Sequence, residues 1–309
     1  MSAPVFMRSN YSDLFGSSML PALEELFRSE LEQHPSRREQ LFKVVQHDRD
    51  IYQSSELHDM PLFSAVAEGS DYSFSRPKQG ASKTLTVVKY GLGFSISEEA
   101  VDDGKFDFIA DAIRKMARSA RESQEIAAMD IFNNAFGTAT VADGLSLCNT
   151  AHTLPSGLTF RNRPSAEVDL SATSLDAALT DFDSQFIGDS GIIYKMAPKK
   201  LVVPSGLKRY AMELIGSDLK ADSMDNNMNS LKSEGLSVLS SPHLTDSDAW
   251  FLVAEPMDTG LRIISRKPIE TKAGGSDVGF VNDSILYKSR YREQVGAVHA
   301  YGVWGTQGI

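Results

Sequence analysis

A serine and a histidine are the first candidates for chemistry in this sequence. Ser190 lies in the string Gly-Asp-Ser-Gly at 188–191, and His152 precedes it; a Ser–His–Asp triad would use these residue types. The stretch between them is too short for the strands of a double-barrel hydrolase, and it is predicted to hold a helix. Asp-Ser-Gly is also ordinary turn chemistry. A serine hydrolase that uses Ser190 and His152 therefore stays a remote alternative.

A polar run at 225–229 resembles the opening of a calcium-binding loop. Its sequence, Asp-Asn-Asn-Met-Asn, fits the first positions of an EF-hand. The sixth position should be glycine but is Ser230, and the twelfth should be a bidentate glutamate but is Leu236. The run therefore predicts a polar loop and no calcium site.

Other signatures of catalysis or cofactor binding are missing from the sequence. The six histidines are scattered without the spacing of a zinc site, and the single cysteine, Cys148, excludes an internal disulfide. Neither a dinucleotide-binding GxGxxG nor a phosphate-binding GxxxxGK[ST] string occurs. No carboxylate pair stands out among 41 acidic residues. We expect no enzyme activity, no catalytic residue, no cofactor and no metal.

The composition is that of a globular protein with an acidic balance. The 309 residues are 41% hydrophobic and 23% charged, and the net charge is −10. A protein that grips phosphate backbones usually has a basic excess instead. No apolar run is long enough to span a membrane, and the first residues lack the pattern of a secretory signal. The sequence thus predicts a soluble protein made in a reducing compartment.

The elements that would position any site alternate between helical and extended patterns. Leu20, Leu23, Phe27 and Leu31 predict a helix that Pro35 ends. Period-two alternation up to Ile96 predicts a strand, within a long two-stranded ribbon over 64–97 that needs a neighbouring surface. The strongest helix is predicted over 105–136. A second helix over 175–186, a buried strand over 199–204, a helix over 207–215 and further strands at 236–239, 250–253 and 285–304 follow.

The order of these pieces resembles one family. A polar arm, a ribbon, a very long helix, a Gly-rich segment, a Pro-flanked strand with a helix, a polar loop and returning strands resemble the major capsid proteins of tailed bacteriophages. Within that family the chain is most similar to the Mu-type major head subunits. The resemblance covers about residues 55–305. The strings that carry it are Glu-Gly at 68–69, Lys-Tyr-Gly-Leu-Gly-Phe-Ser-Ile-Ser-Glu-Glu-Ala at 89–100, Asp-Gly-Leu-Ser-Leu at 143–147, Ala-His at 151–152, Ser-Gly at 156–157, Leu-Ser at 170–171, Leu-Asp-Ala-Ala-Leu at 175–179, Pro-Lys-Lys-Leu-Val-Val-Pro at 198–204 and Asp-Ala-Trp-Phe-Leu at 248–252.

The resemblance implies an α+β fold of the tailed-phage major capsid type, with four parts. Residues 1–54 would form an N-terminal arm and 55–97 an extended β-ribbon loop that lies over a neighbouring subunit. Residues 98–198 and 266–309 would form a peripheral domain with the long helix, about 105–136, as its spine. Residues 199–265 would form an axial domain near the capsomer axis.

The resemblance also implies a function and a set of partners. The chain would self-assemble into hexamers and pentamers of an icosahedral shell that encloses double-stranded DNA without sequence-specific binding. Its acidic charge suits a container that holds DNA without sticking to it. Because the arm is short, we expect a separate scaffolding protein, besides a portal and a possible decoration protein. The chain would be made in the bacterial host cytoplasm and end in the virion capsid, and we expect no membrane contact.

Two groups of residues follow from the resemblance as candidate contacts. The ribbon contacts to a neighbour are expected at Tyr72, Phe74, Arg76, Lys78 and Lys83. The loop at the capsomer axis is expected to present Asp222, Asp225, Asn226, Asn227 and Asn229. Some members of the family cross-link neighbours through a Lys–Asn isopeptide bond. No asparagine or activating carboxylate can be matched to Lys78 or Lys83, so cross-linking is not expected.

One rival reading uses the same fold for another purpose. An encapsulin-type nanocompartment shell protein would enclose an enzyme in place of DNA. The ribbon and the arm favour the phage head, and the content of the particle distinguishes the two.

Overall fold

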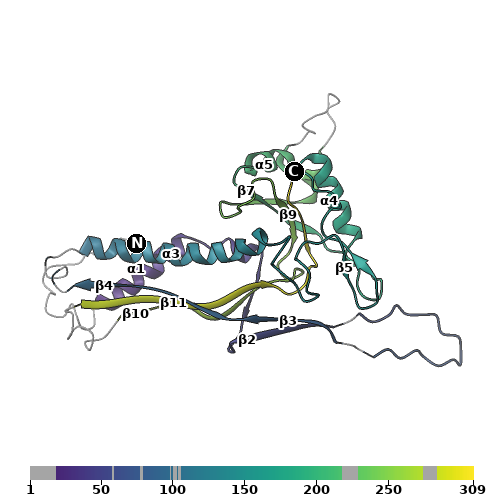
Figure 1. Cartoon of the computed structure of the whole chain (residues 1–309), viewed down its shortest axis with the longest axis horizontal. Helices are drawn as coiled ribbons and strands as arrows, with labels where there is room; N and C mark the ends of the chain where they lie inside the picture. The colour runs from purple at the N-terminus through teal and green to yellow at the C-terminus, as the bar shows by residue number, and fades with distance from the viewer. Residues whose placement is uncertain are drawn as a thin grey trace. The chain divides into compact units, whose positions relative to one another are not determined.

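The computed structural model describes residues 19–57, 59–76, 79–97, 99, 103, 106–217, 229–273 and 284–309. Contacts divide the chain into two compact units (Figure 1). The first holds the described parts of 1–36, 88–124 and 266–293, and the second those of 37–87, 125–265 and 294–309. The chain crosses between units inside one helix and two strands, so this division differs from the four parts expected from the sequence. The four-part scheme remains a prediction.

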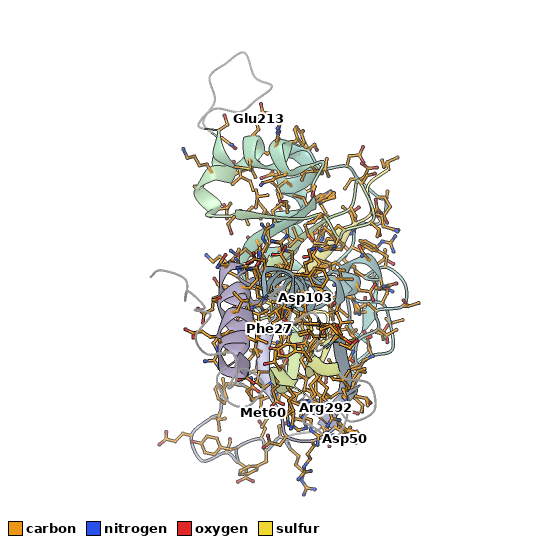
Figure 2. All side chains as sticks on the ribbon, turned by 90° about the vertical axis from the view of Figure 1, so that its left-hand side faces the viewer. Phe27, Asp50, Met60, Asp103, Glu213 and Arg292 are labelled. Carbon is orange, nitrogen blue, oxygen red and sulfur yellow. The ribbon has the colours of Figure 1, made fainter. Side chains whose placement is uncertain are left out.

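The first unit is built on two helices and a strand pair. Helix α1 (Met19–Gln33) and the first part of α3 (Phe106–Asn133) are the two amphipathic helices predicted from period-3.6 patterns. Their apolar faces meet in one cluster with the strands β4 (Val88–Ser97) and β11 (Ser284–Ala297). The buried members are Leu23, Phe27 (labelled in Figure 2), Ile96, Ile109, Ile113, Met116, Ala117 and Tyr287.

Polar contacts fix the end of α1 on the long helix. The guanidinium of Arg121 donates to the carbonyl oxygen of Leu31 at 3.4 Å, and Arg118 lies 3.7 Å from the carboxylate of Glu30. A cation next to the last carbonyls of a helix also suits the helix dipole. Helix α1 is therefore held by contacts within the first unit.

The predicted strand before the long helix exists, but its partner is distant in sequence. β4 is antiparallel to β11, with Tyr90 opposite Tyr291 and their rings stacked 5.0 Å apart. In the described chain the sheet order is β1-β10-β11-β4, which leaves β4 at an edge. The other members are β1 (Lys43–Gln46) and β10 (Leu261–Ala273), which pair in parallel through 262–265. The sequence did not indicate β1 or β10.

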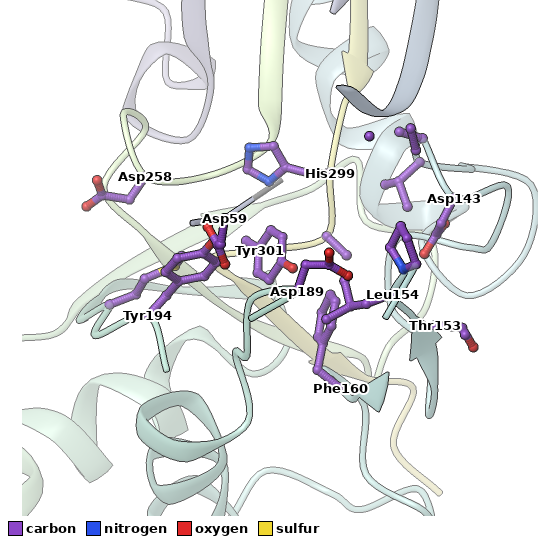
Figure 3. A pocket seen from close by; sticks show the side chains of 17 residues that line it. Asp59, Asp143, Thr153, Leu154, Phe160, Asp189, Tyr194, Asp258, His299 and Tyr301 are labelled. Carbon is purple, nitrogen blue, oxygen red and sulfur yellow. The ribbon is translucent and has the colours of Figure 1, made fainter. Parts of the chain in front are cut away.

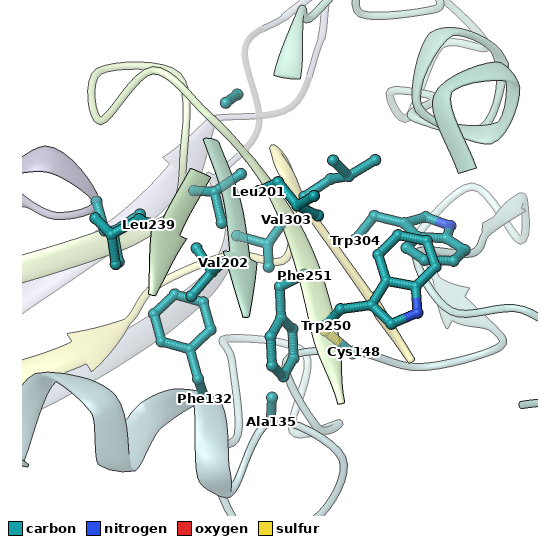
Figure 4. Close-up of a cluster of buried hydrophobic side chains, with 14 of the residues drawn as sticks. Phe132, Ala135, Cys148, Leu201, Val202, Leu239, Trp250, Phe251, Val303 and Trp304 are labelled. Carbon is teal, nitrogen blue, oxygen red and sulfur yellow. The ribbon is translucent and has the colours of Figure 1, made fainter. Parts of the chain in front are cut away.

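The second unit is centred on a sheet with the order β12-β9-β7-β8. Its strands are β7 (Pro198–Pro204), β8 (Ser237–Ser241), β9 (Trp250–Ala254) and β12 (Val303–Thr306). Every residue of β9 is buried, as its unbroken apolar run suggests. Figure 4 shows the packed rings, with Trp250 against Trp304 at 5.0 Å and Phe251 against Phe132 at 5.1 Å between centroids.

Helices and small sheets surround this core. α4 (Ala172–Ser184) begins at a capping box in which Ser171 and Ser174 bond each other's backbone, and its N-cap is Ser171. α5 (Lys208–Gly216) follows β7, and the short helices η2 (Arg38–Gln40) and η3 (Ser230–Glu234) precede β1 and β8. β5 (His152–Thr153) pairs with β6 (Thr159–Phe160).

The ribbon is formed by strands that differ from those expected. β2 (Ile51–Leu57) is antiparallel to β3 (Gln79–Thr86), with Ile51 opposite Thr86. The ladder therefore begins before residue 55 and ends at 86, and β4 leaves it to join β11. Leu85 and Val87 anchor the base of the ribbon in a cluster with Ile264 and Val298. The segment 59–76 between the two strands forms neither helix nor strand.

No described helix has the length and apolar character that crossing a membrane would need.

Candidate inter-subunit surface

The segment 59–76, called here the ribbon loop, presents large apolar side chains to solvent. Phe63 and Phe74 are fully exposed at 106% and 94%, and Leu62 and Tyr72 are exposed at more than two thirds. A turn at 67–70, closed by the Ser70 amide on the Ala67 carbonyl and by Gly69 at φ +81°, reverses the chain between them. Figure 2 shows the side chains around Met60 pointing outward from the drawn backbone. A concentration of exposed apolar groups on one segment is typical of a protein contact surface.

The structure places the predicted ribbon contacts in two environments. Tyr72, Phe74 and Arg76 are exposed on the ribbon loop. Lys83 lies on β3, and its Nζ donates to Thr140 Oγ1 at 2.9 Å, so it has a partner within the chain. Lys78 lies outside the described residues. Whether these residues meet another subunit stays a prediction.

Sequence reasoning overlooked the first half of the ribbon loop. Met60, Leu62, Phe63 and Val66 are exposed apolar residues that no helical or strand period marks. The available signal was an apolar run next to Pro61 in a segment bounded by Gly69 and Ser70. Apolar residues without a period inside a turn-rich segment indicate exposure between elements, and such exposure calls for a partner.

Of the residues predicted for the capsomer-axis loop, the structure describes only Asn229. Its side chain is buried: Nδ2 donates to the carbonyl oxygens of Leu214 at 2.7 Å and Ser217 at 3.0 Å, and Oδ1 accepts from the amide of Leu231. Asn229 thus supplies hydrogen-bond partners to backbone groups at the end of α5 and at the start of η3. Asp222, Asp225, Asn226 and Asn227 lie outside the described residues.

The hydrolase alternative finds no support in the environment of His152. This side chain is buried; its Nδ1 lies 2.6 Å from Asp143 Oδ2 and its Nε2 lies 3.2 Å from Asn162 Oδ1. Both ring nitrogens are therefore engaged. Ser190 Oγ is buried without a hydrogen-bond partner among the described residues, so no base activates it.

The histidine belongs to a buried network that holds the Gly-rich segment on the sheet. Asn162 Nδ2 donates to the backbone carbonyl oxygens of Leu147 and Val303. The backbone carbonyl oxygen of Asn162 accepts from the amide of Gly305. Burial alone would raise the pKa of Asp143, but the hydrogen bond and charge of His152 and the Leu145 amide outweigh it and hold that pKa below its ordinary value. The position and composition of this network indicate that its role is to stabilise the fold.

The described residues also contain no group of three or more His, Cys, Asp and Glu side chains arranged to hold a metal ion.

Comparison with solved structures shows a recurrent fold. The capsid structure of Cyanophage P-SCSP1u is similar with a TM-score of 0.63 and 11% identity, over 89% of this chain and 88% of that one. The capsid of the native GTA particle gives 0.57 and 12%, over 87% and 89%. A virus-like particle from Pyrococcus furiosus gives 0.52 and 11%, over 92% and 97%. No curated protein sequence matches the chain.

These likenesses confirm the expected α+β tailed-phage major capsid fold, and at such identities they concern the fold alone. A family model adds evidence at the level of sequence. The model described as phage capsid protein matches residues 80–304, which is well over half of the chain. The match begins after the ribbon loop and ends within β12. It does not resolve the Mu-type subgroup, which stays a prediction. The chain belongs to the phage capsid protein family.

Proposed function

We propose that this chain is the major head subunit of a tailed phage and forms an icosahedral shell of hexamers and pentamers around double-stranded DNA. Membership of the capsid family and the capsid fold support a shell-forming, structural role in the virion. The observation that carries the proposal in the molecule itself is the ribbon loop. Phe63 and Phe74 are almost fully exposed, so their rings contribute no buried area to an isolated subunit. Burial of these rings against another copy would stabilise assembly.

The proposal assigns the parts of the chain to roles in the shell. The arm up to residue 54 and the ribbon with its loop over 55–97 contact neighbouring subunits. Residues 98–198 and 266–309 act as the peripheral domain, and 199–265 act as the axial domain around the capsomer axis. A separate scaffolding protein and a portal act during assembly in the host cytoplasm, and a decoration protein binds outside where one is present.

The shell of an encapsulin-type nanocompartment is the second candidate function. The similarity to the virus-like particle from Pyrococcus furiosus is the reason to test this second candidate, because that similarity extends over most of both chains.

The content of purified particles distinguishes the two candidates. The full chain is produced with the neighbouring gene products of its source, and particles are purified, treated with nuclease and opened. The phage-head proposal predicts nuclease-protected double-stranded DNA and no stoichiometric protein cargo. Particles that hold a folded enzyme and no DNA would favour the nanocompartment, and a protein that stays monomeric would contradict both.

A further inference from the structure

The long strands β4 and β11 carry helices on only one side of their sheet. Tyr287 of β11 is buried in the cluster with α1 and α3, and Figure 1 shows both helices on that side of the strands. Because successive side chains of a strand alternate, the even-numbered residues of β11 from Leu286 to Arg292 point to the other side. These side chains are exposed or half-exposed, whereas Tyr287 and Tyr291 are buried. We call this side of β4 and β11 the open face.

Basic side chains gather on the open face. Lys89 lies directly opposite Arg292 in the ladder between β4 and β11, and Arg290 and Lys288 follow on β11 at period two. Arg290 pairs with Glu270 of β10 at 3.5 Å. Lys89, Lys288 and Arg292 have no ion pair with an acidic side chain among the described residues. The open face is therefore locally positive in a chain whose net charge is −10.

Two glycines flatten the same face. Gly91 lies opposite Arg290 and Gly93 opposite Lys288, and an added Cβ would lie 3.6 Å and 3.3 Å from the Cβ atoms of those two residues. Carbonyl oxygens of β11 would lie at 3.3 Å and 3.1 Å, so glycine also eases the ladder. Neither glycine has a positive φ, so no turn requires it. Glycine inside a strand often marks a place where another backbone approaches closely, and here it leaves a shallow strip bordered by cations.

The turn of the ribbon loop carries the opposite charge. Glu68 and Asp71 lie in and beside the turn over 67–70; both are exposed, and neither has an ion pair with a described basic side chain. No lysine or arginine occurs between residues 59 and 75. Tyr72 is 73% exposed, and Leu286 on the open face is 40% exposed, so each surface also offers an apolar group.

The base of the ribbon loop is held by its own copy. Figure 3 shows Asp59 next to Tyr194, whose hydroxyl donates to Asp59 Oδ1. The carboxylate of Asp59 is therefore engaged within the chain. The acidic groups that the loop leaves for a contact with another copy are Glu68 and Asp71.

We propose that the open face of one copy binds the acidic turn of the ribbon loop from a second copy. The inference rests on the proposed function, since shell assembly brings copies into contact, and it names the surface that receives the loop. Opposite charges on two surfaces steer their association and fix the register of the contact. The glycine strip and Leu286 favour a protein segment over nucleic acid, because contacts to a phosphate backbone need cations but no apolar neighbour.

Charge reversal on either surface tests the pairing. Glu68→Lys with Asp71→Lys, or Lys89→Glu with Lys288→Glu, places like charges opposite each other at the proposed contact. All four side chains are exposed, so each subunit should fold normally. Each double variant should need at least about tenfold more subunit to form particles at low salt, because like charges across an interface are costly. The four changes combined restore opposite charges, and assembly should return to within about threefold of the wild type.

A matched control separates specific pairing from net charge. Lys115→Glu with Lys195→Glu changes the same number of charges at exposed positions outside the open face. Added to the loop reversal, this pair restores the net charge but not the contact, so assembly should stay impaired. Equal recovery with either lysine pair would overturn the inference. It would also be overturned by no recovery in the four-change variant, or by wild-type assembly of either double reversal.

A cryo-electron microscopy map of wild-type particles decides the inference even where a variant fails to fold. The inference predicts that Glu68 or Asp71 of one copy lies within ion-pair distance of Lys89 or Lys288 of another. An empty open face would overturn it, and so would a face covered by DNA, by a different protein or by the loop of the same copy. Failure of the wild type to form particles would instead overturn the proposed function, a result distinct from particles in which the turn lies elsewhere.

Discussion

Replacement of Phe63 and Phe74 by serine should raise the subunit concentration needed for shell assembly about a hundredfold, while the subunit itself stays folded. Both side chains are fully exposed, at 106% and 94%, so the substitution removes no contact within the chain. Surface changes of this kind shift stability by about 0.5 kcal/mol or less. The free energy of unfolding of the isolated subunit should therefore stay close to that of the wild type.

The effect on assembly follows from the area that these rings expose. Full burial of a phenylalanine contributes about 1.5–3 kcal/mol, so two rings contribute about 3–6 kcal/mol per contact between copies. At about 1.4 kcal/mol per factor of ten, the loss corresponds to a factor of about 10²–10⁴ in the association constant. Since association also costs free energy for ordering loops and side chains, we expect the lower end of this range, a loss of about a hundredfold in the association constant.

The assay measures the subunit concentration at which particles form, by sedimentation and light scattering. The double variant should need at least about a hundredfold more subunit than the wild type. Ser73→Ala with Ser75→Ala, two exposed changes in the same loop that remove no apolar surface, should assemble normally. Assembly of Phe63→Ser/Phe74→Ser at the wild-type concentration would refute the argument, and so would a large drop in subunit stability.

Four further predictions concern core packing, acid stability, Ser190 and cross-linking. Gly305→Ala should destabilise the subunit by about 1–3 kcal/mol, because the new Cβ would lie 2.4 Å from a ring carbon of Phe251; a melting temperature equal to the wild type would contradict this close packing. The lowered pKa of Asp143 means that its contribution to stability is present above its ordinary pKa of 3.8 and is lost as the pH falls through the lower folded value. In urea unfolding, the advantage of the wild type over Asp143→Asn should therefore shrink between neutral pH and about pH 2.5, and a constant advantage would count against it. Ser190→Ala should leave assembly unchanged, and intact particles should run on denaturing gels as one 33.8 kDa band; serine-dependent ester hydrolysis or a ladder of cross-linked bands would contradict these two expectations.

The sequence predicted the local elements of the fold better than their pairing. The long helix α3 was predictable because Ile109, Ile113 and Met116 recur with the helical period and no glycine or proline interrupts them. β4 was recognised as a strand, but its partner β11 lies almost two hundred positions later, and alternation in one strand carries no information about a distant partner. The sequence did not indicate β10, because charged residues interrupt the apolar pattern in the half-exposed part of this strand.

The candidate surface was predictable only in part, for a related reason. Tyr72, Phe74 and Arg76 were expected at a contact because the family resemblance placed the ribbon there, and not because of any pattern in the residues. Phe63 was overlooked, since an exposed aromatic residue in a loop has no period that could mark it. Asn229 was assigned to the axis loop by its polar neighbours, whereas its amide group is used within the chain to join α5 and η3.

Electron microscopy of the purified full-length chain, alone and with the products of neighbouring genes, tests the central claim most directly. The account predicts closed icosahedral shells built from hexamers and pentamers, in which the ribbon loop of each copy lies on the surface of a neighbour with Phe63 and Phe74 buried. Monomers under all assembly conditions, or closed shells in which this loop projects into solvent and touches no other copy, would contradict it.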